Sequence, residues 1–159
     1  MSNYSLESML AQPYDCLVLA NPHVQFLDDI SEKVQSFGVK HLNVSKELSS
    51  ALMTVPTTER SRFAQGWMKD LLGQIKDEPI LCSHPDLFFH PSLKIDFFTL
   101  IRQVARIKRV IILWPGEYSR DTLSYAIPEH RHYKVWNISD SLLIQPRILI
   151  FQISAAEGA

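Results

Sequence analysis

The chain has 159 residues, of which 46% are hydrophobic and 21% charged, a balance typical of one soluble globular domain. The chain has 16 lysines and arginines and 17 aspartates and glutamates, which gives a net charge of −1. It is therefore not strongly basic, as many nucleic-acid-binding proteins are. The apolar runs are far shorter than the roughly 20 residues of a membrane-spanning helix, and no basic, apolar leader opens the chain. We therefore expect a single cytoplasmic domain over residues 1–159, without membrane contact.

Five short apolar runs predict five strands, at residues 14–20, 39–44, 79–83, 109–114 and 147–153. These runs are nearly continuous in Val, Ile and Leu, which is typical of strands that are covered on both faces. Between them, apolar residues recur at helical spacing in three segments: from near Phe26 to Gly38, over 57–76 and over 92–106. The alternation predicts an α/β fold, a three-layer sandwich with a mainly parallel five-stranded sheet.

The cysteines and histidines do not form a recognisable metal-binding motif. Cys16 and Cys82 each lie in an apolar strand, so we expect buried, reduced thiols. His84 and His90 follow Cys82 closely, and His130 and His132 alternate, but the spacing differs from that of paired zinc ligands. We expect no metal site, and surface histidines beside buried strands.

The segment after the first strand is where an α/β nucleotide-binding protein places its phosphate loop. Here it reads Asn-Pro-His-Val-Gln over residues 21–25, and the first glycine of the chain is Gly38. Glycines let consecutive backbone N–H groups converge on the phosphates, while a lysine reaches the terminal phosphate. This segment has neither the glycines nor the lysine, so we expect it not to bind phosphate. The sequence also contains no glycine-rich nucleotide-binding motif and no glycine-flanked serine nucleophile motif.

Three phrases, taken together, resemble one protein family. They are His-Leu-Asn-Val-Ser-Lys-Glu-Leu at 41–48, Leu-Phe-Phe-His-Pro-Ser-Leu-Lys-Ile-Asp at 87–96, and Leu-Trp-Pro-Gly at 113–116 with Thr-Leu-Ser-Tyr-Ala at 122–126. In this order, over about residues 17–144, the chain resembles the BrxF family, small P-loop proteins of the BREX bacteriophage exclusion systems. The resemblance implies an additional-strand, P-loop NTPase-like core with a phosphate loop after the first strand and a Mg²⁺-binding acid after the third.

The chain departs from the family pattern at both functional positions. The phosphate-loop lysine and hydroxyl fall near Phe26 and Leu27, and the metal-facing aspartate falls at Ser83, with Asp86 as the nearby acid. Lysine and magnesium offset the phosphate charge during NTP hydrolysis, so we expect no nucleotide cofactor and no hydrolysis.

We expect the degenerate nucleotide site at the carboxyl edge of the sheet, where open α/β folds place their ligands. Its candidate residues are Asn21, His23, Gln25, Phe26, Leu27, Ser83, Asp86 and Trp114, with His84 and Glu117 beside them. Trp114 is expected to fill the former pocket, since a large aromatic ring occupies space while its N–H finds a partner.

Two groups of basic residues are candidate contacts for a nucleic acid or a protein partner. Arg102, Arg106, Lys108 and Arg109 cluster at the end of the predicted helix 92–106, where cations meet the negative end of the helix dipole. Arg131 and Lys134 alternate with aromatic residues, a pattern that can bind phosphates or stack on bases.

The leading hypothesis is a catalytically inactive, P-loop-like pseudo-ATPase with a structural or regulatory role in bacterial antiviral defence. Its partners would be other proteins of the defence complex. One alternative is a nucleic-acid-binding module of such a system. The other is an enzyme of unrelated chemistry at the carboxyl ends of the strands.

Overall fold

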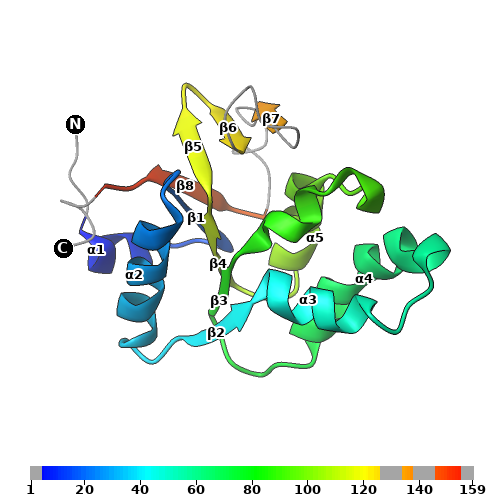
Figure 1. Ribbon diagram of the computed structural model, residues 1–159. Coiled ribbons are helices and arrows are strands. Elements are labelled where there is room, and N and C mark those ends of the chain that lie inside the picture. The colour runs from blue at the N-terminus through cyan, green and yellow to red at the C-terminus, as the bar shows by residue number, and fades with distance from the viewer. Residues whose placement is uncertain (1–4, 126–133, 138–145, 155–159) are drawn as a thin grey trace.

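The computed structural model describes residues 5–125, 134–137 and 146–154, with a five-stranded sheet at its centre (Figure 1). The strands are β1 (Cys16–Ala20), β2 (Lys40–Asn43), β3 (Ile80–Ser83), β4 (Val110–Trp114) and β8 (Ile148–Gln152). They lie in the order β2-β3-β4-β1-β8, and every neighbouring pair is parallel. The predicted α/β class and all five predicted strands are confirmed.

Helices cover both faces of this sheet, which makes three layers (Figure 1). On one face lie α1 (Leu6–Leu10) and α2 (Val24–Gln35), and on the other lie α3 (Val44–Leu52), α4 (Arg60–Gly73) and α5 (Phe97–Ala105). Short 3-10 turns, η1 (Thr57–Glu59), η2 (Pro85–Phe89) and η3 (Pro91–Leu93), join these elements. No helix among the residues described is both long and apolar enough to cross a membrane.

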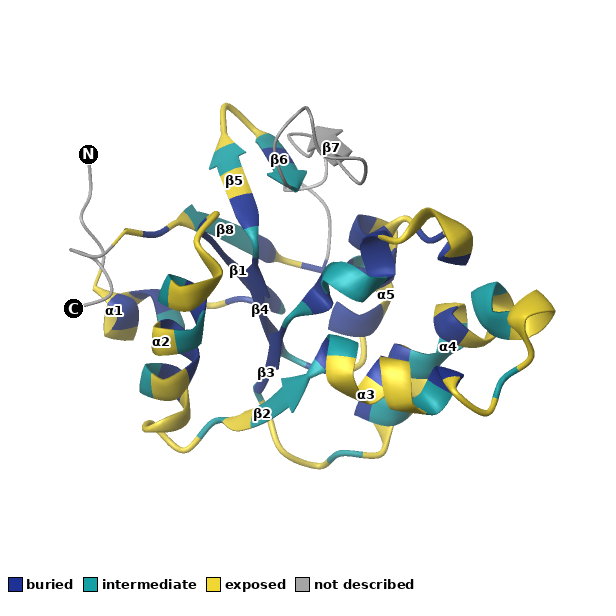
Figure 2. Ribbon diagram, in the orientation of Figure 1, coloured by how far each residue is buried: buried dark blue, intermediate teal, exposed yellow. Residues whose placement is uncertain are grey.

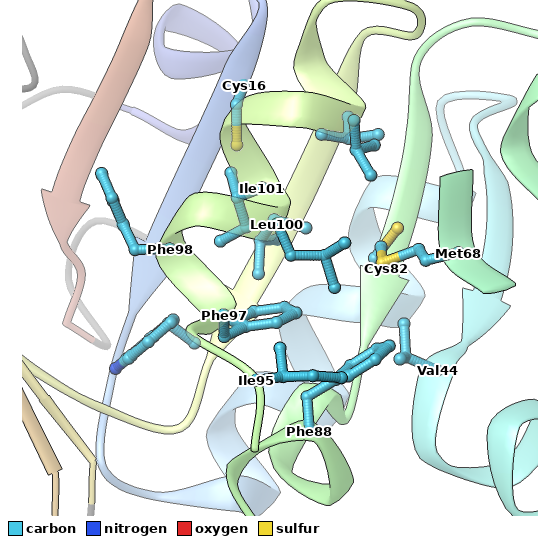
Figure 3. Packing of buried hydrophobic residues seen from close by; sticks show 14 of the residues in the cluster. Cys16, Val44, Met68, Cys82, Phe88, Ile95, Phe97, Phe98, Leu100 and Ile101 are labelled. Atoms are coloured by element: carbon cyan, nitrogen blue, oxygen red, sulfur yellow. The ribbon is translucent and has the colours of Figure 1, made fainter. Parts of the chain in front are cut away.

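The sheet separates two hydrophobic cores, because successive side chains of a strand point to opposite faces. Cys16 and Val18 belong to the core beneath α3, α4 and α5, whereas Leu17 and Leu19 belong to the core beneath α1 and α2. Figure 3 shows part of the first core, where Phe88 and Phe97 stack with ring centroids 5.3 Å apart. All residues of β1 and β4 are buried, as the dark strands of Figure 2 show, which explains their continuous apolar sequence.

The predicted helix over 57–76 is observed as η1 followed by α4, and it ends at Gly73. Two other predicted boundaries are wrong, and a side-chain cap explains each. The second strand was expected to include Val44, but the Asn43 side chain accepts a hydrogen bond from the Lys46 N–H (3.1 Å) and starts α3, a helix that the sequence did not predict. The third predicted helix begins at Phe97, because Asp96 accepts a hydrogen bond from the Phe98 N–H (3.2 Å). The first two residues of the predicted helix, Ser92 and Leu93, belong to the η3 turn instead.

A second, antiparallel sheet is the largest element that the sequence did not predict. It consists of β5 (Gly116–Ser119), β6 (Thr122–Tyr125) and β7 (Lys134–Asn137), in that order, above the carboxyl end of the central sheet in Figure 1. Between β5 and β6 the chain turns at Arg120 and Asp121, both with positive φ. The Trp114 indole N–H donates to the Ser124 carbonyl (2.9 Å) and so attaches this sheet to the core.

Candidate site at the carboxyl edge of the sheet

The connection between β1 and α2 consists of residues 21–23 alone. The Asn21 N–H donates to the Trp114 carbonyl (3.1 Å), and its side-chain Nδ2 donates to the Ile153 carbonyl (2.8 Å). The Asn21 Oδ1 in turn accepts the His23 N–H (2.8 Å), and Pro22 has no N–H to offer. Since every backbone N–H of the connection is used within the protein, the connection cannot cradle a phosphate.

A cavity of about 420 Å³ lies between the first half of α2 and the carboxyl ends of β3 and β4. Its volume is in the range of sites that hold small organic molecules. Most of its wall is apolar, and its polar side chains come from α2, from β3 and the turn after it, and, with Tyr125, from β6. The lining residues are Pro22, Val24, Leu27, Asp28, Ser83, His84, Asp86, Leu113, Pro115 and Tyr125.

The charged groups of this cavity disfavour a polyphosphate. Asp28 and Asp86 contribute carboxylates, and the described lining residues include neither lysine nor arginine. His84 Nε2 lies 3.1 Å from Asp28 Oδ1, so the one imidazole of the lining is already paired with an acid. An anionic ligand would therefore approach two carboxylates without an opposing basic side chain.

His84 occupies a left-handed turn between β3 and η2, with φ 52° and ψ 59°. Its carbonyl accepts hydrogen bonds from both the backbone N–H (2.9 Å) and the hydroxyl of Ser45, at the start of α3. The Ser45 hydroxyl oxygen also accepts the Leu87 N–H (3.0 Å). These bonds offset the cost of the left-handed backbone and hold the turn that carries His84 toward α2.

A second polar pair lies next to the first, at the end of β3. The Ser83 hydroxyl and His41 Nε2 of β2 are 2.6 Å apart, and Ser83 is only 3% exposed. Burial lowers the pKa of His41, and the neighbouring His84 lowers it further, while Asp28 acts in the opposite direction. The His41 imidazole is therefore neutral at neutral pH and can accept the proton of the serine.

The structure brings some of the predicted site residues together and separates others. Leu27, Ser83, His84 and Asp86 line the cavity. Asn21 and His23 build the β1–α2 connection, as described above. The remaining predicted residues, Gln25, Phe26, Trp114 and Glu117, are not among the residues that line it.

Strand and helix periodicity explain the residues that do not line the cavity. Leu113 takes the cavity side of β4, so the adjacent Trp114 points to the opposite core, where its ring lies 5.1 Å from that of Phe89. Phe26 packs against the core beneath α1 and α2, and exposed Gln25 donates to Asp29 (3.4 Å).

Sequence reasoning missed several lining residues, above all Asp28, the acid that pairs with His84. Helical spacing could have found it, because Val24, Leu27 and Asp28 stand three and four residues apart on one face of α2. Tyr125 had no such signal, since it reaches the cavity from the small sheet, which the sequence did not predict.

The basic residues near α5 differ in how far they are available to a partner. Lys108 is buried, and its ammonium donates to the Ile75 carbonyl. The Arg109 Nε donates to the Tyr14 carbonyl (3.0 Å), and its guanidinium lies over the Tyr14 ring, 4.5 Å from the centroid. Arg106 is exposed and Arg102 half-buried. Lys134 lies in β7, and Arg131, His130 and His132 lie outside the described residues.

No protein-family model, curated protein or solved structure matches this chain. Within the described part of the chain, no three His, Cys, Asp or Glu side chains are grouped so that they could hold a metal ion. The interpretation of the cavity thus depends on its own geometry and on the sequence.

Proposed function

We propose that the chain is a P-loop-like pseudo-ATPase, inactive in nucleotide hydrolysis, with a structural or regulatory role in a bacterial anti-phage defence system. The resemblance to the BrxF family supports the type of system and the expectation that its partners are other proteins of the defence complex. The sheet order supports the P-loop-like core, because β4 lies between β1 and β3 as an inserted strand. A fold of this kind can keep its surfaces for docking after its site has changed.

The β1–α2 connection is the observation that carries the proposal. A phosphate loop of the form Gly-x-x-x-x-Gly-Lys-Ser/Thr cannot be accommodated in residues 21–23 before α2 begins. Phe26 and Leu27, at the positions expected for the lysine and hydroxyl, are apolar residues of α2, and Leu27 is buried. Neither can place a positive charge or a metal-binding oxygen beside a phosphate.

The third strand supports the same conclusion. Ser83 stands where the family pattern expects the metal-facing aspartate, and its neutral hydroxyl is paired with His41. Asp86 is an acid, but it lies beyond the strand end in η2 and faces the same cavity as Asp28. Ser83 and Asp86 thus support the proposal that this strand end lacks the Mg²⁺-binding acid on which phosphoryl transfer depends.

Isothermal titration of the full chain with ATP and GTP, each with Mg²⁺, tests this proposal. We expect no binding in the micromolar range, because residues 21–23 offer no free backbone N–H, and the lining residues place two carboxylates, but neither lysine nor arginine, beside a polyphosphate. Micromolar binding that is lost in Asp86→Ala or His23→Ala would contradict it. Asp29→Ala is the matched control, since Asp29 lies on α2 and does not line the cavity.

A further inference from the structure

The proposed function leaves the hydrogen-bonded Ser83 and His41 pair at the cavity unused. We propose that Ser83 and His41 act as nucleophile and general base in the hydrolysis of a small, uncharged ester bound in this cavity. This activity goes beyond the proposed function and is independent of it, because it requires neither a nucleotide nor a metal ion.

The first support is the geometry of the pair. The Ser83 hydroxyl and His41 Nε2 are 2.6 Å apart, which is within the distance that a general base needs to remove a proton. Ser83 lines the cavity yet is almost fully shielded from bulk solvent. A substrate that displaces solvent from the cavity would therefore meet the hydroxyl at the cavity wall.

The second support is the protonation state of His41. Burial and the nearby His84 lower its pKa, and this outweighs the opposite effect of Asp28. An imidazole with a lowered pKa stays unprotonated at neutral pH, as a general base must. His84 itself is paired with Asp28. This pair connects α2 to the turn after β3, and both of its residues line the cavity.

The third support is the lining of the cavity, which selects a class of substrate. Leu27, Leu113 and Pro115 offer an apolar wall for an acyl chain, while Asp28 and Asp86 disfavour an anionic substrate. The cavity also borders the start of α2 at Val24. Backbone N–H groups in the first turn of a helix have no partner within it, and this positive end can stabilise the negative oxygen of a tetrahedral intermediate.

The reaction divides into two steps that balance. His41 Nε2 takes the proton of Ser83 Oγ as this oxygen attacks the ester carbonyl carbon. The bond from that carbon to the alcohol oxygen then breaks, and the proton on His41 passes to the departing alcohol. In the second step His41 deprotonates a water molecule that attacks the acyl-serine, and the proton returns to Ser83 Oγ as the carboxylic acid is released. The acid ionises, and Asp28 and Asp86 repel the product.

A second serine and histidine pair, outside the cavity, serves as a control for Ser83 and His41. His90 Nδ1 and Ser92 Oγ are 2.7 Å apart, so they form a similar contact, but both residues are exposed and neither lines the cavity. A serine hydroxyl next to a histidine is therefore present in two surroundings. Only the pair at the cavity is expected to react.

Labelling of the full chain with a fluorophosphonate, followed by peptide mapping, and hydrolysis of p-nitrophenyl acetate and butyrate test the proposal. We expect the label on Ser83 and an esterase activity that Ser83→Ala abolishes. His41→Gln should slow both reactions by about 100-fold or more, the usual contribution of a general base. Ser92→Ala should leave both reactions unchanged. The hydrolysis rate should fall as acidification protonates His41, and because the His41 pKa is lowered, this fall should occur at a pH below the ordinary imidazole pKa.

Absence of label on Ser83, equal label on Ser92, or esterase activity that survives in Ser83→Ala would overturn the proposal. If Ser83→Ala does not fold, Ser83→Cys replaces it, because a thiol beside His41 should react with iodoacetamide faster than an ordinary cysteine. A thiol that reacts no faster would likewise overturn it. Because nucleotide titration is measured separately, failure of this activity leaves the proposed function untouched, and the reverse also holds.

Discussion

At the scale of single residues, burial decides the protonation of the titratable groups in the central sheet. His41 is a base, so partial burial lowers its pKa, whereas Cys82 is an acid, and full burial raises its pKa to about 12. The pKa of Cys16 is raised in the same direction, first by burial and then by Cys82 and Asp15. In each case the neutral form is favoured, because a charge in the core would lack a compensating partner.

The two thiols give a prediction about reactivity. Cys16 and Cys82 are free and buried, so the native chain should not react with Ellman's reagent at pH 8, and both thiols should react after unfolding. The same groups make stability depend on alkaline pH. Because folding raises the pKa of both thiols, their contribution to stability is fully present below the ordinary thiol pKa and is lost at higher pH, for Cys82 as the pH rises through about 12. Rapid labelling of either thiol in the native chain would contradict this prediction.

At the scale of elements, the small antiparallel sheet depends on close contact between Gly116 and β6. A Cβ at Gly116 would lie 1.8 Å from the Ser124 carbonyl oxygen and 2.9 Å from the Trp114 Nε1. The same carbonyl accepts the Trp114 indole hydrogen bond. Glycine at this position therefore permits both the strand pairing and the attachment of the small sheet to the core.

We expect Gly116→Ala to lower the free energy of unfolding by about 2 kcal/mol or more, because a backbone atom must move to make room. The matched variant is Gly73→Ala in α4, where the new methyl group meets nothing within 4 Å. It should leave stability unchanged or raise it by up to about 0.5 kcal/mol, because the advantage of alanine over glycine is smaller at the last residue of a helix than in its interior. Urea denaturation of both variants measures the difference, and equal stability would contradict the clash.

The elements that could be predicted from the sequence are those with long, unambiguous patterns. The strands β1 and β4 have continuous apolar runs because both faces are covered, and α2 repeats its apolar residues at helical spacing. The α3 helix was missed because its start depends on one capping side chain, Asn43, directly after a strand. The small sheet was missed because β5 and β6 are short and mostly only half-buried, so their apolar pattern is weak.

The candidate site could be predicted only in part, for a related reason. The ends of the strands indicated Ser83, His84 and Asp86 because carboxyl ends of parallel strands share one edge. The pairs that organise the cavity join residues from different elements, His41 with Ser83 and Asp28 with His84. Such pairs depend on the rotation of α2 and on the register of β2 against β3, which a single sequence does not specify.

At the scale of the whole molecule, charge favours protein partners over nucleic acid. The chain is nearly neutral, and two of the basic residues near α5, Lys108 and Arg109, are bound within the fold. Loss of either would remove an internal contact as well as a charge. A continuous basic surface of the kind that binds phosphates is thus not built from this cluster.

We therefore expect no shift of double- or single-stranded DNA in mobility assays at low salt. Under the proposed function, we expect co-elution with a protein encoded beside this chain in size-exclusion chromatography. DNA binding that weakens steeply between low and physiological salt would instead favour the nucleic-acid-binding alternative. Arg106→Glu is the informative variant there, because Arg106 is exposed, and Arg62→Glu on α4 controls for overall charge.

The three-residue connection after β1 has a consequence for how the molecule could respond to signals. Asn21 hydrogen-bonds to Trp114 at the end of β4 and to Ile153 just after β8. These bonds fix the connection in one conformation, so it is not free to open and close around a ligand. Nucleotide-dependent switches change conformation because segments of the chain are ordered by the γ-phosphate and released after hydrolysis. Under the proposed function, the fixed connection gives this chain no such switch, so an energy-consuming conformational cycle would require a partner that hydrolyses the nucleotide.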